Sequence, residues 1–311
     1  MTSTPFPIDP ALTAIAIAFR NPELIADRVL PRVTPVSKRT FAWNQYPIGT
    51  LYTLPDDRVG RRGTPRQLSY EETRQTAEVE DHGLDDPIPQ DDIDQAASQG
   101  AKSPVDKSVT FHSSLIELGR EVRTAGLVFN TASYPSTNRV TLSGSDQWSD
   151  VTSDPIATIE AAINTPLMRP RKAVFGQLTW SAVRKHPKIV KAANKTSGDT
   201  GLVTKEAFAE IFELEEVIVG NAYVNTAKRG QAVTMSRTWG KHAAFLYQDP
   251  LADNDHGVTF GITVPYKTKI AGATPDGDIG LRGGQRVRVG ESLKELIVSG
   301  DCGYYIQNAT A

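Results

Sequence analysis

The residue types that most often carry catalysis are present in this chain, but their spacing matches no catalytic pattern. The sequence has no phosphate-loop string Gly-x-x-x-x-Gly-Lys-Ser/Thr, no nucleophile elbow Gly-x-Ser-x-Gly, no His-Glu-x-x-His and no Cys-x-x-Cys. The histidines are scattered without ligand spacing, and they are His82, His112, His186, His242 and His256. We therefore expect that the protein is not an enzyme and that it has no catalytic residue and no cofactor.

Two short segments have residue types that bind ions, and neither has the right context. Asp249, Asp253 and Asp255 precede Gly257, but their spacing does not fit the twelve-residue calcium loop and no glutamate closes it. The segment Gly280–Gly284 (Gly-Leu-Arg-Gly-Gly) has the residue types for approaching a phosphate, but no strand–loop–helix pattern surrounds it. A β-turn is the better interpretation of this segment. We expect no metal site in the chain.

Composition indicates a soluble globular protein with no overall attraction for a polyanion. The 311 residues are 39% hydrophobic and 23% charged, with a formal net charge of -2. The single cysteine, Cys302, excludes an intrachain disulfide and a thiolate zinc site, and we expect it to be a small buried residue. The apolar run at residues 11–19 is too short to span a bilayer, and no basic residue precedes it.

The stretch at residues 44–100 has opposite charges in separate blocks and few large apolar residues. Its basic residues are Arg58, Arg61, Arg62 and Arg66. Its acidic residues are Glu71, Glu72, Glu78, Glu80, Asp81, Asp85, Asp86, Asp91, Asp92 and Asp94. Such a stretch is typical either of disorder or of an arm that becomes ordered on another subunit, and blocks of opposite sign favour self-association.

A long amphipathic helix is predicted at about residues 105–132. Ser103 and Pro104 form a helix-start pattern. The apolar residues that follow recur at spacings of four and three and form one stripe, which we expect to pack in a core: Phe111, Leu115, Leu118, Val122, Ala125 and Phe129. The charged residues Glu117, Arg120, Glu121 and Arg123 lie off this stripe.

The remaining segments predict an α+β protein. Short helices are expected at residues 11–19 and 22–29, and a small mixed α/β layer at residues 154–219. The last ninety residues alternate mostly as strands, for example at Arg286–Val289.

The order of these segments resembles that of the major capsid proteins of tailed bacteriophages, the Hong Kong ninety-seven-type shell fold that encapsulins share. The strings that carry the resemblance run through nearly the whole chain. They are Asp9-Pro-Ala-Leu-Thr-Ala-Ile-Ala-Ile-Ala18, Arg58-Val-Gly-Arg-Arg62, His82-Gly-Leu-Asp-Asp-Pro87, Arg120-Glu-Val-Arg-Thr-Ala-Gly-Leu-Val-Phe129, Ser153-Asp-Pro155, Phe212-Glu-Leu-Glu-Glu-Val217 and Trp239-Gly-Lys-His242. Their order, a ribbon before a long helix before an α/β layer, carries more information than any one string.

The resemblance implies a division of the chain into functional parts. These are an N-terminal arm at 1–40, an extended β-ribbon loop at 41–90 that reaches a neighbouring subunit, a peripheral domain at 91–153 built on the long spine helix, a mainly axial α/β domain at 154–235, and C-terminal β segments at 236–311 that complete both domains.

The same resemblance implies the partners. It predicts pentamers and hexamers in an icosahedral shell around double-stranded DNA, which is contacted without sequence specificity, and assembly in the bacterial host cytoplasm before procapsid maturation. Because the arm begins almost at Met1, the resemblance also predicts a separate scaffolding protein. It predicts a portal as well, with a decoration protein as a further candidate partner. No membrane is involved.

For the subunit contacts, we expect the tip residues Arg58, Arg61, Arg62 and Arg66 to meet acids of the next copy. The candidate acids are Glu71, Glu72, Asp85 and Asp86. Some relatives cross-link a loop lysine to a neighbour, but this chain has no lysine between Lys38 and Lys102, so no such cross-link is expected. The alternatives are an encapsulin-like compartment and, less favoured, a soluble enzyme or binding module with a long acidic loop.

Overall fold

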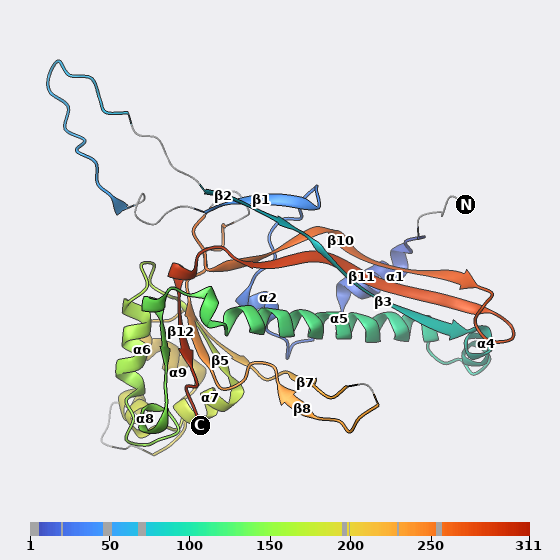
Figure 1. Ribbon diagram of the computed structural model, residues 1–311. Helices are drawn as coiled ribbons and strands as arrows, with labels where there is room; N and C mark the ends of the chain where they lie inside the picture. The colour runs from blue at the N-terminus through green and yellow to red at the C-terminus, as the bar shows by residue number, and fades with distance from the viewer. Residues whose placement is uncertain are drawn as a thin grey trace.

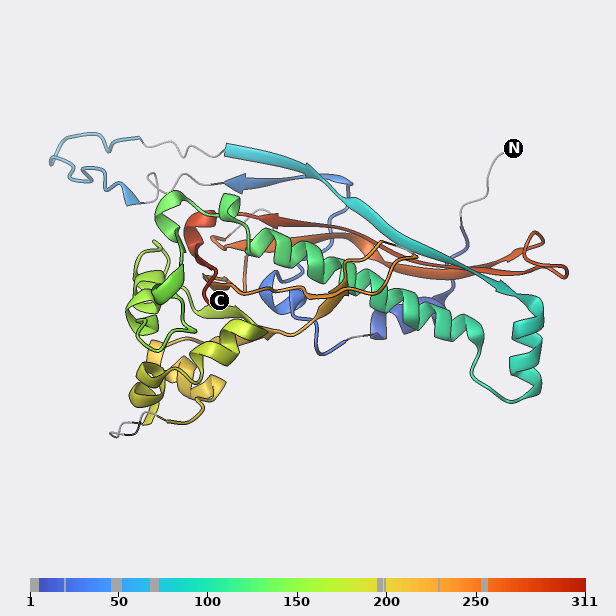
Figure 2. The ribbon, with the colours of Figure 1, turned by 60° about the horizontal axis from the view of Figure 1, so that its bottom comes forward.

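The protein is elongated, as the computed structural model in Figures 1 and 2 shows. The structure describes residues 6–19, 21–45, 52–67, 73–194, 198, 200–228, 230–252 and 257–311. A helical body with its own sheet lies at one end, and a long sheet backed by one long helix extends from it (Figure 1). A ribbon leaves the upper side and projects away from both.

The long sheet has three antiparallel strands in the order β10-β11-β3. Strands β10 (Gly261–Asp276) and β11 (Gly284–Ile297) form a hairpin whose turn contains most of Gly280–Gly284, so the predicted β-turn is confirmed. Strand β3 (Glu80–Pro89) pairs with the other side of β11. The alternation at Arg286–Val289 is confirmed, because Val287 and Val289 are buried.

Three helices accompany this sheet. Helix α5 (Pro104–Val128) lies along it, with α1 (Pro10–Ala18) beside it and α4 (Gln90–Ser98) at its far end (Figure 1). At 1.5 Å per residue, α5 is about 38 Å long. Its apolar contacts with α1, β3, β10 and β11 form a core of Leu12, Ala16, Ile88, Val105, Val109, Ile116, Ala271, Val287 and Val289. Helix α5 ends at Val128, short of the predicted residue 132, because Phe129 leaves the helical conformation and Asn130 caps a following 3-10 turn.

The predicted core stripe of α5 is wrong over most of its length. Phe111, Leu115 and Val122 are 60%, 40% and 38% exposed, and Leu118 is only partly buried. Ala125 is buried and Phe129 packs against a neighbouring ring, so the stripe meets a core only at the end of the helix. The side of α5 that faces the sheet mixes apolar residues with buried polar ones, namely Ser108, Ser113, Arg120, Glu121 and Thr124. Hydrophobic periodicity assigns such polar residues to solvent. Ser108, Arg120 and Glu121 instead have hydrogen-bond partners from other parts of the chain.

The second sheet has five strands in the order β4-β12-β9-β5-β6. These strands are β4 (Arg139–Thr141), β12 (Gly303–Gln307), β9 (Ala243–Leu246), β5 (Lys172–Gly176) and β6 (Glu216–Gly220). Four helices accompany it, namely α6 (Pro155–Asn164), α7 (Gln177–Val183), α8 (Pro187–Asn194) and α9 (Lys205–Phe212). The mixed α/β layer predicted for residues 154–219 is therefore present.

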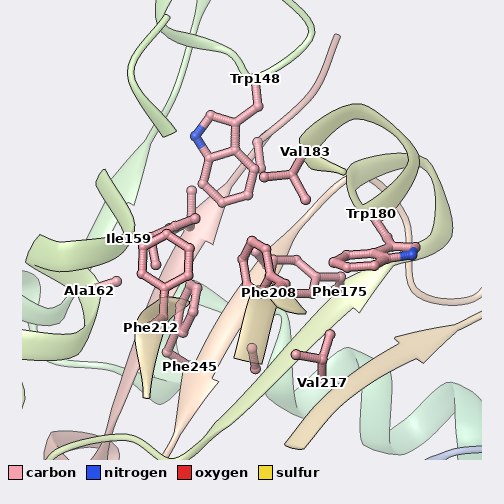
Figure 3. Close-up of a cluster of buried hydrophobic side chains, with 14 of the residues drawn as sticks. Trp148, Ile159, Ala162, Phe175, Trp180, Val183, Phe208, Phe212, Val217 and Phe245 are labelled. Carbon is pink, nitrogen blue, oxygen red and sulfur yellow. The ribbon is translucent and has the colours of Figure 1, made fainter. Parts of the chain in front are cut away.

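Both faces of the five-stranded sheet are buried, because alternate residues point to opposite sides. In β5, Ala173 and Phe175 join the core that the helices cover, where Figure 3 shows Phe175 beside Phe208 and Trp180. Val174, between them, joins a second core that includes Val128 at the end of α5. The five-stranded sheet is thus fixed to the helix that supports the long sheet.

The remaining elements are short. They are α2 (Ala26–Val29), the ribbon strands β1 (Thr40–Gln45) and β2 (Thr73–Glu78), the hairpin β7 (Tyr223–Asn225) and β8 (Met235–Arg237), and the 3-10 turns at Thr131–Ser133, Ser136–Asn138, Gly144–Asp146 and Gly300–Cys302. Among the residues that the structure describes, no helix combines the length and the apolar character needed to cross a membrane.

Candidate intersubunit surface

The tip of the ribbon projects from the body and exposes all of its side chains. Residues 52–67 are exposed throughout, and the segment bends where the Gly63 N–H donates to the Gly60 carbonyl at 2.8 Å. The predicted residue Arg66 approaches Asp56 of the same tip at 3.7 Å, while 71% of its side chain remains exposed. Within the described residues Arg58, Arg61 and Arg62 form no ion pair, so the predicted basic tip is available to another molecule.

The predicted acidic partners Asp85 and Asp86 already have partners within their own chain. Arg288 donates to both Asp85 oxygens at 2.6 Å, and the Ser108 hydroxyl donates to Asp86 at 2.6 Å. The reason is that residues 80–89 form a strand of the body, although they fall within the range expected for the loop. Asp85 lies directly opposite Arg288 in the register of β3 and β11.

Three further acids of the run are paired within the chain. Asp81 accepts from Arg39 at 2.9 and 3.1 Å, Lys294 donates to Glu80, and Arg282 donates to Asp91 at 2.8 Å. Hydrogen bonds from Arg288, Arg39 and Lys294 lower the pKa of Asp85, Asp81 and Glu80 respectively. Asp85 and Glu80 thus join β3 to β11 in ionised form, and Asp81 joins β3 to the residue that precedes β1. Glu71 and Glu72 lie outside the described residues.

The outward side of α5 is a second exposed surface. Phe111, Leu115 and Val122 lie on this side, which faces away from the long sheet, and they form an apolar row along the helix. Sequence reasoning found these residues but assigned them to a core within the chain.

A buried carboxylate on the other side of α5 holds the N-terminal segment in place. Glu121 is 0% exposed and accepts from the N–H groups of Ile25 at 3.0 Å and Ala26 at 2.8 Å, and from the Trp239 indole N–H at 2.6 Å. Burial raises the pKa of Glu121, and these three donors partly counteract the effect. One side chain thus joins the start of α2, the spine helix and the segment ahead of β9.

The neighbouring Arg120 ties the same segment to the long sheet. Its guanidinium donates to Asp27 at 2.5 Å, to the Leu30 carbonyl at 3.0 Å and to the Thr263 hydroxyl at 3.1 Å. Burial lowers the pKa of Arg120. For Asp27 burial acts to raise the pKa, but the cations Arg120 and Arg32 bring it below its ordinary value. In the sequence, Arg120 and Glu121 lie off the apolar stripe, and no local pattern identifies them as buried.

His186, His242 and Cys302 lie among packed side chains of the fold. Burial lowers the pKa of His186 and of His242, whose ring packs against Phe129 at 5.4 Å between centroids. Cys302 is 1% exposed, as predicted, and burial raises its pKa to about 11, so its thiol is unreactive at neutral pH. No group of three or more metal-ligating side chains occurs within the described ranges, which do not include Asp253 and Asp255.

Solved structures of phage proteins share the fold of this chain. A phage-related protein from Bordetella bronchiseptica RB50 matches at a TM-score of 0.76 and 22% identity, with 98% of each chain covered. The capsid structure of cyanophage P-SCSP1u matches at a TM-score of 0.56 and 11% identity, over 90% of this chain and 86% of that one. At these identities the matches establish the fold.

The sequence itself establishes the family. Residues 132–252 match the family described as phage major capsid protein E. The major capsid protein of Pseudomonas phage JBD67 is 48% identical over 311 residues, which cover 100% of both chains. The chain therefore belongs to the family of phage major capsid proteins. This agrees with the resemblance seen in its motifs and supports the capsid interpretation over an encapsulin-like compartment.

Proposed function

We propose that this protein builds the icosahedral shell of a tailed bacteriophage around packaged double-stranded DNA. It forms the pentamers and hexamers of that shell and assembles in the cytoplasm of the bacterial host. Family membership and the capsid-subunit fold support the proposal. The predictions of no enzymatic activity and no cofactor belong to this proposal.

The observation that supports the proposal most strongly is the ribbon, whose tip does not pack against its own subunit. The tip at residues 54–66 is exposed and projects away from the long sheet and the helical body (Figures 1 and 2). A segment with four arginines and an exposed leucine, held away from its own core, fits a contact across a neighbouring copy.

The parts of the fold can be assigned to the axial domain, the peripheral domain and the N-terminal arm of a capsid subunit. The five-stranded sheet and its four helices serve as the axial domain around the local symmetry axes. The long sheet and α5 serve as the peripheral domain, and residues before β1 serve as the N-terminal arm. The C-terminal strands divide between the two, because β10 and β11 lie in the long sheet while β9 and β12 lie in the five-stranded sheet.

The remaining partners are proposed on the same basis. A scaffolding protein and a portal act with the shell, and a decoration protein is a further candidate partner. A net charge of -2 favours loose, sequence-independent contact with the packaged DNA over tight electrostatic binding.

The test is electron microscopy of the purified protein beside two tip variants. We expect shells or capsomers from the unaltered protein, and loss of closed particles when residues 54–66 are replaced by a Gly-Ser linker. A variant with Arg58, Arg61, Arg62 and Arg66 all changed to Lys keeps the charge and should still assemble. A monodisperse small oligomer of the unaltered protein at every salt concentration would overturn the proposal.

Particle contents separate the two kinds of shell. Particles from infected cells should contain double-stranded DNA and a portal. A protein cargo without nucleic acid would instead indicate an encapsulin-like compartment.

A further inference from the structure

A groove of about 460 Å³ crosses the face of the long sheet that is turned away from α5. Val287 and Val289 of β11 point to the core with α5, so the residues between and after them, Arg288 and Gly290, face the other way. Gly290 lies opposite Gly83 of β3, and the pair leaves the middle of this face without side chains. A Cβ added at Gly290 would meet the His82 carbonyl at 3.1 Å.

The walls of the groove combine apolar surface with cations. Ile8, Tyr266 and Ile270 supply the apolar surface. Arg39 and Arg288 lie at the rim, and each already pairs with an aspartate of β3. The groove therefore has an apolar interior and an edge of charged residues, of which Arg39, Arg288, Asp81 and Glu291 are ion-paired.

Lys267 is the unpaired cation of this rim. It lies in a β-bulge between Tyr266 and Ile270, with φ of 58°, a conformation that a non-glycine residue adopts only at a cost. Its ammonium group lies 5.1 Å from the Tyr266 ring centroid, and it has no carboxylate partner within the described residues. The bulge thus places above the groove a lysine that has no ion-pair partner among the described residues.

We propose that this groove binds the Leu54–Asp57 segment (Leu-Pro-Asp-Asp) of a second copy of the chain. The segment has the matching chemistry, since Leu54 is 93% exposed and Asp57 forms no ion pair within the described part of the chain. Leu54 enters over the paired glycines, and Asp57 pairs with Lys267. This inference rests on the proposed function, in which the ribbon lies across a neighbour.

Only another copy supplies this segment, because the ribbon tip of the same chain points away from the long sheet (Figures 1 and 2). The charges also specify which part of the tip enters. Lys267 is the cation of the groove without an ion-pair partner in the described residues, so the groove selects the acidic start of the tip and leaves the arginines that follow for other contacts.

The experiment is a charge exchange measured by the subunit concentration at which shells form. Lys267→Glu and Asp57→Lys are each expected to raise that concentration about fivefold at about 50 mM NaCl, because each places like charges together at every such contact. The double variant Lys267→Glu/Asp57→Lys should return it to within about twofold of the unaltered protein. Misfolding cannot produce such a rescue.

The control is Lys191→Glu, an equal charge change at an exposed position of α8, which should leave the concentration unchanged. Leu54→Ser tests the apolar half of the contact and should also raise it. Single variants that assemble like the unaltered protein, or a double variant that assembles worse than both, would contradict binding of the tip segment in the groove. The proposed shell function would be unaffected by either result. Absence of shells from the unaltered protein would instead contradict the proposed function.

Discussion

At the scale of single residues, α5 is organised by two buried charges whose partners come from distant parts of the chain. Glu121 accepts from Ile25, Ala26 and Trp239, while Arg120 reaches Asp27 and Thr263. A buried charge is tolerated only when its hydrogen bonds are complete, so removal of one partner costs more than an exposed pair contributes. These two side chains set where the N-terminal segment lies relative to both sheets.

Replacement of Glu121 by Gln should therefore destabilise the subunit. The amide keeps the size but turns one acceptor oxygen into a donor that faces backbone N–H groups. We expect the free energy of unfolding to fall by about 1–3 kcal/mol in urea titrations. Glu160→Gln, at an exposed position of α6, is the matched control and should be within about 0.5 kcal/mol of the unaltered protein. Equal stability of the two variants would contradict the role given to Glu121.

The pair of Asp85 and Arg288 predicts a pH dependence. The hydrogen bond from Arg288 lowers the pKa of Asp85 below its ordinary 3.8. A lowered carboxyl pKa contributes stability above the unfolded value and loses it as the pH falls through the folded value. Asp85→Asn should cost about 0.5–1 kcal/mol at neutral pH, since the pair is partly exposed.

The difference between Asp85→Asn and the unaltered protein should shrink below about pH 4, as followed by urea unfolding across pH. Asp92→Asn, at an exposed position of α4, is the control. A difference that stays constant between pH 7 and pH 3 would show that the ion pair does not contribute.

At the scale of elements, α5 has two unlike faces, and the apolar one is not the buried one. The exposed side presents Phe111, Leu115 and Val122, whereas the sheet side mixes Val109 and Ile116 with buried polar groups. Such a helix is packed within the subunit on one side and offers an association surface on the other.

Substitutions on the two faces should affect different properties, namely subunit stability on the buried face and shell assembly on the exposed face. Ile116→Ala should lower the free energy of unfolding by about 2–4 kcal/mol, because it leaves a cavity against β11. Phe111→Ser and Val122→Ser should each change it by no more than about 0.5 kcal/mol, yet reduce the yield of shells seen by electron microscopy. A loss at Phe111 as large as that at Ile116 would mean that the row is packed in the isolated subunit.

Elements with local signals are the ones that the sequence predicts. Asp9, Asp154 and Thr204 cap helices as their positions suggest, each accepting from a backbone N–H of the first turn. Strand β3 has no such signal, because its residues are mostly charged and its partner strand lies about two hundred residues later. Its ion pairs, and hence the fate of Asp85, depend on a register that local pattern cannot reveal. The partners of Arg120 and Glu121 also lie far away in the sequence, so local pattern cannot reveal them either.

At the scale of the whole molecule, two sheets share one long helix and a ribbon projects outward. Residues from four separate parts of the chain meet in the core between α5 and the five-stranded sheet, among them Leu30, Val128, Val174 and Tyr305. The helix and the five-stranded sheet are therefore packed together at that junction, and the tip is the part that reaches beyond it. The order of elements was predictable from sequence, but the exposed groove on the long sheet required the fold.

The shell should be held without covalent bonds through the ribbon. The chain has no lysine between Lys38 and Lys102 to donate to a neighbour. Denaturing electrophoresis of mature particles should give a single band at the monomer mass of 33.8 kDa. A ladder of higher bands that persists after boiling would contradict this, with particles treated with a chemical cross-linker as the positive control.

The exposed tip also bears on how long a free subunit survives. Its backbone is accessible and contains Arg58, Arg61, Arg62 and Arg66, each a point where a trypsin-like protease can cut. When a neighbour covers the tip, as we propose, the same bonds are shielded. Cleavage at these arginines would thus measure the fraction of subunits not yet incorporated, and in a cell it would remove the ones that arrive without partners.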